Sequence, residues 1–125
     1  MNKLQQENKK REILNQLKYT SLAGSKEGYF YAYASESQAH MDKKYLIWKK
    51  LKKLGYSIWV EPIFDKTNSR PDILAFRGGY WNNIEILESE TIKELKEKLE
   101  KYPVEFHTIV IKTNKDIENL EDDLI

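Results

Sequence analysis

The fold is decided by the stretch Arg70-Pro71-Asp72-Ile73-Leu74-Ala75-Phe76-Arg77-Gly78-Gly79-Tyr80-Trp81-Asn82-Asn83-Ile84-Glu85-Ile86-Leu87. Two runs of β-branched, aromatic and alternating residues flank a Gly-Gly pair, a pattern typical of a tight hairpin with a primed turn. We therefore predict a β-hairpin whose two loop residues are the glycines. In that register Asp72 lies directly opposite Glu85.

The opposed pair Asp72 and Glu85 suggests a cation site. Directly opposed residues share one face of a sheet, and like charges placed so are destabilising unless something compensates them. Mg²⁺ would compensate the two negative charges, because it takes oxygen ligands from one or two carboxylates. A solvated face with both acids in water is the alternative, which the register leaves open. Repulsion also predicts that Asp72→Asn slightly stabilises the metal-free protein.

The order of these residues resembles the PD-(D/E)xK nuclease superfamily. Pro71-Asp72 begins one strand, Glu85 lies in the next, and a helix follows. The resemblance covers about residues 35–112 and implies a restriction-endonuclease-like fold. It also implies that Asp72 and Glu85 bind Mg²⁺ or Mn²⁺. The implied activity is metal-dependent hydrolysis of phosphodiester bonds in nucleic acid, with DNA the favoured substrate.

One position departs from the family pattern. A lysine usually stands two residues after the glutamate, and this chain has Leu87 there. The predicted register places Arg70 opposite Leu87, so Arg70 is the expected electrostatic stabiliser. Lys93 or Lys96 from the following helix could serve instead. The alternative is a catalytically inactive nuclease-fold module of viral or mobile-element origin that binds nucleic acid or protein.

A capping-box pattern precedes the first helix of the expected core. Ser35-Glu36-Ser37-Gln38 has the S-x-x-Q form, which predicts a helix beginning at Glu36, and Gly55 supplies its end. In the resembled family this helix often carries a further acid of the metal site, so the resemblance assigns that ligand and catalytic role to Glu36. The positive end of the helix dipole alone also favours an acid there.

The same helix carries a one-sided lysine cluster. We expect these lysines to cover its surface against the single acid Asp42, although a merely solvated face is the alternative. A phosphodiester-binding surface needs such a cluster. The predicted nucleic-acid-binding residues are Lys43, Lys44, Lys49, Lys50 and Lys53.

Composition narrows the classes of function. The chain has 125 residues, which fits one domain, and its net charge of +1 gives no global argument for nucleic acid. It contains no cysteine and two histidines, which excludes thiolate chemistry and a histidine-rich zinc site. No apolar run approaches a membrane span, and the N-terminus does not resemble a signal peptide. We expect a cytoplasmic protein, and a homodimer if both strands of a duplex are cut.

The predicted order is α-β-β-β-α-β with an additional helix at each end, which indicates an α/β fold with a mixed sheet flanked by helices. A helix near the C-terminal end of the hairpin has Ile92, Leu95, Leu99 and Tyr102 as its inward stripe. The single domain divides into an N-terminal helix and tyrosine-rich arm, a core and a C-terminal helix, at residues 1–34, 35–112 and 113–125. The elements are expected at residues 3–18 (helix), 20–28 (loop), 29–34 (edge strand or extended arm), 36–54 (helix), 56–62 (strand), 70–87 (hairpin), 91–102 (helix), 105–112 (strand) and 114–125 (helix).

Overall fold

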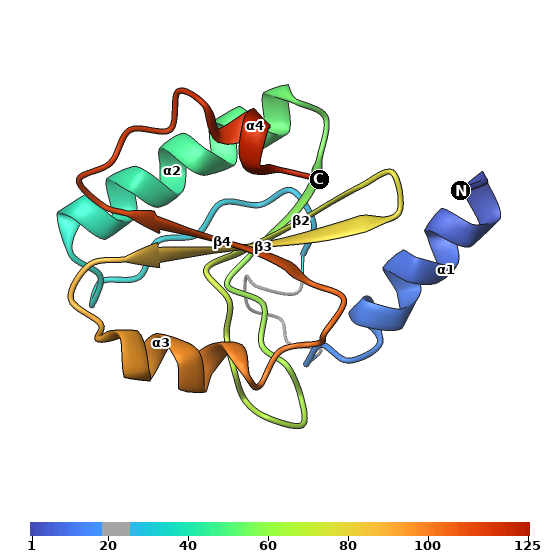
Figure 1. Cartoon of the computed structure of the whole chain (residues 1–125), viewed down its shortest axis with the longest axis horizontal. Helices are drawn as coiled ribbons and strands as arrows, with labels where there is room; N and C mark the ends of the chain where they lie inside the picture. The colour runs from blue at the N-terminus through green and yellow to red at the C-terminus, as the bar shows by residue number, and fades with distance from the viewer. Residues whose placement is uncertain (19–25) are drawn as a thin grey trace.

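The computed structural model describes residues 1–18 and 26–125, so residues 20–25 of the predicted loop lie outside it. Four strands form one sheet, and helices lie on both of its faces (Figure 1). The elements are α1 (Lys3–Leu14), α2 (Gln38–Lys53), β1 (Ser57–Val60), β2 (Ile73–Arg77), β3 (Tyr80–Leu87), α3 (Ile92–Leu99), β4 (His107–Lys112) and α4 (Leu120–Asp123).

The sheet has the strand order β1-β2-β3-β4, with the first three strands antiparallel and β4 parallel to β3. A parallel pair needs a crossover connection, and α3 supplies it. The predicted α-β-β-β-α-β order, with an additional helix at each end, is confirmed. This arrangement agrees with the core of a restriction-endonuclease-like fold.

The hairpin has the predicted register. Arg77 pairs with Tyr80, and Ile73 pairs with Ile84. Gly78 and Gly79 have φ angles of 64° and 91°, the positive values that a primed turn requires. The ladder begins at Ile73, so Asp72 lies directly before the start of β2.

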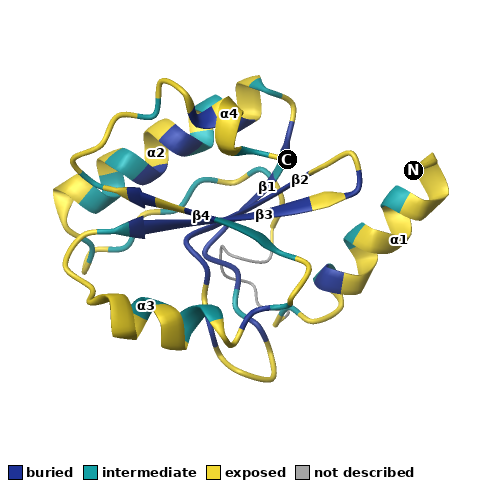
Figure 2. Cartoon of the chain, viewed as in Figure 1, coloured by how far each residue is buried: buried dark blue, intermediate teal, exposed yellow. Residues whose placement is uncertain are grey.

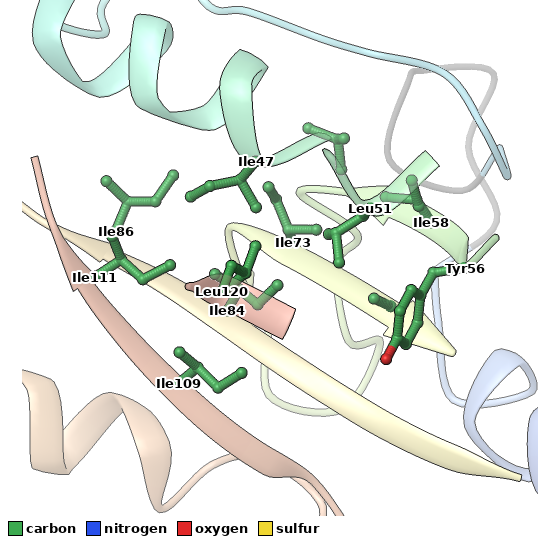
Figure 3. Packing of buried hydrophobic residues seen from close by; sticks show 12 residues of the cluster. Ile47, Leu51, Tyr56, Ile58, Ile73, Ile84, Ile86, Ile109, Ile111 and Leu120 are labelled. Carbon is green, nitrogen blue, oxygen red and sulfur yellow. The ribbon is translucent and has the colours of Figure 1, made fainter. Parts of the chain in front are cut away.

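Both faces of the sheet are buried against helices. On one face, α2 and α4 cover a cluster of mostly aliphatic side chains, many of which Figure 3 labels. On the other face, Ile13 from α1 joins a cluster rich in aromatic rings, with Leu99 at the end of α3 packed against it. Figure 2 shows the consequence, strands that are largely buried between helices with exposed outer surfaces. Within the described residues, no helix has the length and apolar character needed to traverse a bilayer.

Helix α2 begins at Gln38, two residues later than predicted. The cap is Ser37, whose Oγ accepts a hydrogen bond from the His40 backbone N–H at 3.1 Å. Ser35 does not cap the helix as predicted, because Glu36 Oε2 accepts a hydrogen bond from the backbone N–H of Tyr33, at 2.6 Å, in the segment before the helix. Glu36 therefore precedes the helix.

Two further expectations are corrected. Ile92 is 71% exposed, because only the C-terminal half of α3 approaches the sheet. Of the two alternatives for the tyrosine-rich arm, residues 29–34, the edge strand is not formed, and the segment packs Phe30 and Tyr31 against the aliphatic core. The terminal helices are also shorter than predicted, since α1 ends at Leu14 and α4 begins only at Leu120.

The two isoleucines Ile84 and Ile92 make a matched test of this packing. Ile84 is fully buried, so Ile84→Ala should lower the free energy of unfolding by about 2–5 kcal/mol through lost burial and a residual cavity. Ile92→Ala should stay within about 0.5 kcal/mol of wild type because the side chain is already in water. Urea denaturation measures both, and equal losses would contradict the observed orientation of α3.

Candidate active site

Of the predicted acids, Asp72 borders a cavity between the start of β2 and the helix α3. The cavity has a volume of about 600 Å³ and is bordered by residues of both charges. Its lining consists of Lys18, Glu61, Ile63, Asn68, Ser69, Arg70, Asp72, Glu94, Glu97, Lys98 and Lys101.

Asp72 is held at both carboxylate oxygens. Its Oδ2 accepts a hydrogen bond from the Ile86 N–H at 2.7 Å, and its Oδ1 lies 3.5 Å from His40 Nε2. Burial alone would raise the pKa of Asp72, but the His40 contact, the charge of Lys98 and the Ile86 N–H together hold it below its ordinary value. Asp72 is therefore ionised, and its carboxylate is held in place by Ile86 and His40.

Glu85 has the opposite electrostatic character, although it is Asp72's neighbour across the hairpin. It is 2% exposed, and burial together with the charge of Asp72 raises its pKa to about 7. Lys98 opposes this shift, with Nζ 2.8 Å from Glu85 Oε2. The other oxygen, Oε1, is buried and has no hydrogen-bond partner. Of the two acids, Glu85 is therefore the one whose ionised form is disfavoured.

Lys98 is a candidate site residue that was not predicted from the sequence, and its Nζ lies 2.8 Å from Glu85 Oε2. The predicted alternatives, Lys93 and Lys96, are both exposed, and Leu87 pairs with β4. Only Lys98 turns from α3 toward the carboxylates. The signal was its place at the border of the inward stripe of that helix, directly before Leu99 and four residues before Tyr102.

Tyr102 follows α3 and lies beside Glu85. Burial and the negative charge of Glu85 raise the pKa of Tyr102, so the phenol keeps its proton. Its ring packs against Phe64 and Phe106, at centroid distances of 6.0 and 6.3 Å. The hydroxyl is buried and lies close enough to the Glu85 carboxylate to affect its pKa, although no hydrogen bond of ordinary geometry joins the two groups.

Lys44 is 0% exposed, so its predicted place on the surface is wrong. It points inward from α2, and its Nζ lies 2.6 Å from Glu36 Oε1 and 2.8 Å from Glu61 Oε2. A buried ammonium is retained because two carboxylates pair with it. Lys44 therefore belongs to an internal ionic network and cannot contact a phosphate at the surface.

Glu36 reaches Asp72 only through His40. Glu36 Oε1 lies 2.7 Å from His40 Nδ1, while the opposite ring nitrogen faces Asp72. The contact with Asp72, opposed by burial and aided by the charges of both acids, raises the pKa of His40 to about 9. The structure thus makes His40 a cationic bridge. The spacing of four residues from Glu36 was its one sequence signal.

Arg70 does not face Leu87, so that predicted pairing is wrong. It precedes the ladder, where the extrapolated register no longer applies. Its Nε lies 3.6 Å from Glu61 Oε1, and its guanidinium stands 5.1 Å from the Tyr33 ring centroid. Arg70 nevertheless lines the cavity that contains Asp72 and Lys98.

The other lysines of α2 divide into two groups. Lys43 and Lys50 donate to backbone carbonyls of the C-terminal segment, and Lys50 also pairs with Glu121 at 2.7 Å. Lys49, Lys52 and Lys53 are exposed on the outer side of the helix. Lys49 and Lys52 lie over the rings of Tyr45 and Trp48, with each Nζ 4.8 Å from the ring centroid, and all three lysines present their charge to solvent.

The acids of the site differ in how well their oxygen atoms fit a divalent cation. Within the described part of the chain, no group of three or more His, Asp or Glu side chains is arranged to hold a metal ion. The pair Asp72 and Glu85 does fit a hard cation that takes further ligands from backbone or water, because Glu85 Oε1 is a buried acceptor without a partner. Glu36 fits less well, since its oxygens already meet Tyr33, His40 and Lys44.

The fold and the carboxylate pair with its lysine define a nuclease-like α/β domain. The model of one family, the competence protein CoiA nuclease-like domain, matches residues 36–111. This range is more than half of the chain and contains Glu36, Asp72, Glu85 and Lys98, so the chain belongs to that family. No curated protein and no solved structure matches the chain.

The two acids should show opposite pH dependence of stability in metal-free protein. The folded-state pKa of Glu85, about 7, lies above its ordinary 4.5, so its ionisation destabilises the fold as the pH rises through that window. Glu85→Gln should therefore gain stability relative to wild type between about pH 4.5 and 7. Urea denaturation in EDTA measures this.

For Asp72 the sign reverses, because its folded-state pKa is lowered and its ionised form is stabilising. Asp72→Asn should cost stability at neutral pH, and the cost should shrink as the pH falls below the ordinary value of 3.8. This result is opposite to the expectation from repulsion alone. The favourable partners of Asp72 outweigh the effect of burial on its pKa, whereas those of Glu85 do not. Parallel pH profiles for the two variants would contradict this division.

Proposed function

We propose that the chain hydrolyses phosphodiester bonds in nucleic acid with Mg²⁺ or Mn²⁺ at the pair Asp72 and Glu85. The observation that carries the proposal is the position of Lys98, whose Nζ lies 2.8 Å from Glu85 at a cavity that both Asp72 and Lys98 line. Two acids with one lysine are the set that the PD-(D/E)xK resemblance implies. Here α3 supplies the cation that Leu87 does not.

The carboxylates of Asp72 and Glu85, with the backbone carbonyl of Ile86, would hold the cation. A bound divalent ion makes water a nucleophile at neutral pH and neutralises charge on the phosphoryl oxygens. Glu36 was also expected as a ligand. We instead assign it the support of His40, because its oxygens already have three donors.

The chain's own cations act on the substrate. Lys98 keeps its ammonium beside Glu85, where it orients the attacking water and stabilises negative charge that develops in the transition state. Arg70, which borders the same cavity and is partly exposed, binds a neighbouring phosphate oxygen. Buried Asp72 and Glu85 exclude bulk water from one side of this arrangement.

The substrate surface extends along α2. Lys49 and Lys53, with Lys43 and Lys50 beside them, present positive charge to a phosphate backbone. We favour DNA on the family resemblance, and a homodimer if both strands of a duplex are cut. Affinity from such contacts falls as salt rises, because each neutralised phosphate releases counterions.

Lys98→Ala tests the proposed chemistry. Cleavage of labelled DNA and RNA in Mn²⁺ should fall at least about 100-fold, the usual loss when one transition-state contact is removed. Lys96→Ala is the matched control, since this lysine lies on the same helix but is exposed, and its rate should equal that of wild type.

Two outcomes of this experiment would count against the proposal. Equal rates for Lys98→Ala and wild type would remove Lys98 from the mechanism. An inert wild type with every metal and substrate would overturn the nuclease proposal and favour the inactive binding module. In that case Leu87→Lys, which restores the usual family position, would reveal whether only the lysine has been lost.

The double variant Lys49→Gln with Lys53→Gln tests the binding surface. Its affinity for DNA should fall, and the dependence of log K on log salt should become shallower by up to about 1.8, because two phosphate contacts are lost. Lys66→Gln, an exposed lysine in the loop before β2, is the control. Unchanged salt dependence in the double variant would show that α2 does not contact the nucleic acid.

A further inference from the structure

Two neighbouring side chains at the site carry buried oxygen atoms without hydrogen-bond partners. They are Glu85 Oε1 and Tyr102 Oη. Buried polar atoms in native proteins are nearly always paired, so an unpaired one requires an explanation such as a functional contact. Here the carboxylate oxygen of Glu85 is an acceptor, and the hydroxyl of Tyr102 can donate to it.

The place of the Tyr102 hydroxyl is fixed by apolar packing. The ring lies among Phe64 and Phe106, and the backbone N–H of Tyr102 donates to the Leu99 carbonyl at 3.2 Å in the turn that ends α3. The side chain is 7% exposed. Its hydroxyl is therefore held beside Glu85 by contacts that do not involve the acids or a metal.

Packing alone does not require that hydroxyl. The surrounding cluster consists of apolar and aromatic residues, in which phenylalanine would fill the same volume. A buried hydroxyl without a partner opposes folding, because its hydration is lost and nothing replaces it. The neighbour that can use it is the free oxygen of Glu85.

We propose that Tyr102 is a positioning residue for Glu85, an inference that rests on the proposed metal-dependent function. Its hydroxyl donates to Glu85 Oε1 while Lys98 holds Oε2, so the carboxylate is fixed at both ends when it binds the cation. Each carboxylate oxygen has two lone pairs, which leaves room for a metal beside these donors. Such supporting contacts commonly change metal affinity 10- to 100-fold.

The test is Tyr102→Phe in the full chain, with Mn²⁺ binding measured by isothermal titration calorimetry without nucleic acid. The dissociation constant for Mn²⁺ should rise at least about tenfold. The melting temperature of the metal-free protein should be unchanged or slightly higher, because an unpaired buried hydroxyl has been removed. At saturating Mn²⁺, Tyr102→Phe should recover most of the cleavage rate, whereas Lys98→Ala should not.

Tyr56→Phe is the matched control. Tyr56 is also 7% exposed, but its hydroxyl donates to the Ile125 carbonyl at 3.3 Å, in the core under α2. Its removal should lower the melting temperature and leave the affinity for Mn²⁺ unchanged. A tenfold loss in both tyrosine variants would indicate general loosening and overturn the assignment.

The remaining outcomes separate this inference from the proposed function. If wild type and Tyr102→Phe bind Mn²⁺ equally well, Tyr102 only packs, and the nuclease proposal stands without it. If wild type binds no Mn²⁺, the metal-dependent function fails and the inference fails with it. A weaker Mn²⁺ affinity confined to Tyr102→Phe supports both.

Discussion

The register between β2 and β3 is the constraint on which the rest of the structure depends. A two-residue glycine loop sets it, and the alternation of side chains along a strand then sends Ile84 and Ile86 to the aliphatic core and Glu85 to the opposite face. A slip by one residue would exchange these faces and bury a carboxylate under α2. The hydrophobic pattern and the acidic pair therefore specify the same register.

Electrostatic cost at the site is distributed unevenly. Asp72 has a backbone donor and a cationic His40, which lower its pKa against the effect of burial, while burial and the charge of Asp72 raise the pKa of Glu85. The site therefore holds one ionised acid in a preformed setting and one acid whose charge is poorly compensated. A bound cation would compensate it. Removing one partner of a buried ionic network leaves the other charge unpaired. Lys44 and Glu36 therefore contribute to the stability of the network that ends at Asp72.

The match to the CoiA nuclease-like family covers residues 36–111, and the segments outside that range complete the two cores. Ile13 of α1 is fully buried in the aromatic cluster, and the Trp81 Nε1 donates to the Lys9 carbonyl at 3.2 Å. Leu120 of α4 enters the aliphatic cluster, and Lys50 of α2 bonds the carbonyls before it. Both terminal helices are therefore integral to the packed domain, although α1 is polar along most of its length.

The hairpin, its register from Ile73 to Tyr80 and the order of the elements could be predicted from the sequence, because glycine turns and strand alternation are local signals. The sequence did not determine that Lys98 replaces the missing lysine, that Lys44 is internal, or that His40 stands between Glu36 and Asp72. Those facts depend on how α2 and α3 rotate about their axes when they pack on the sheet. A polar residue at the border of a helical stripe can face either solvent or core, and the rotation is set by contacts between segments distant in sequence. Only the tertiary structure could decide which charged side chains the acids meet.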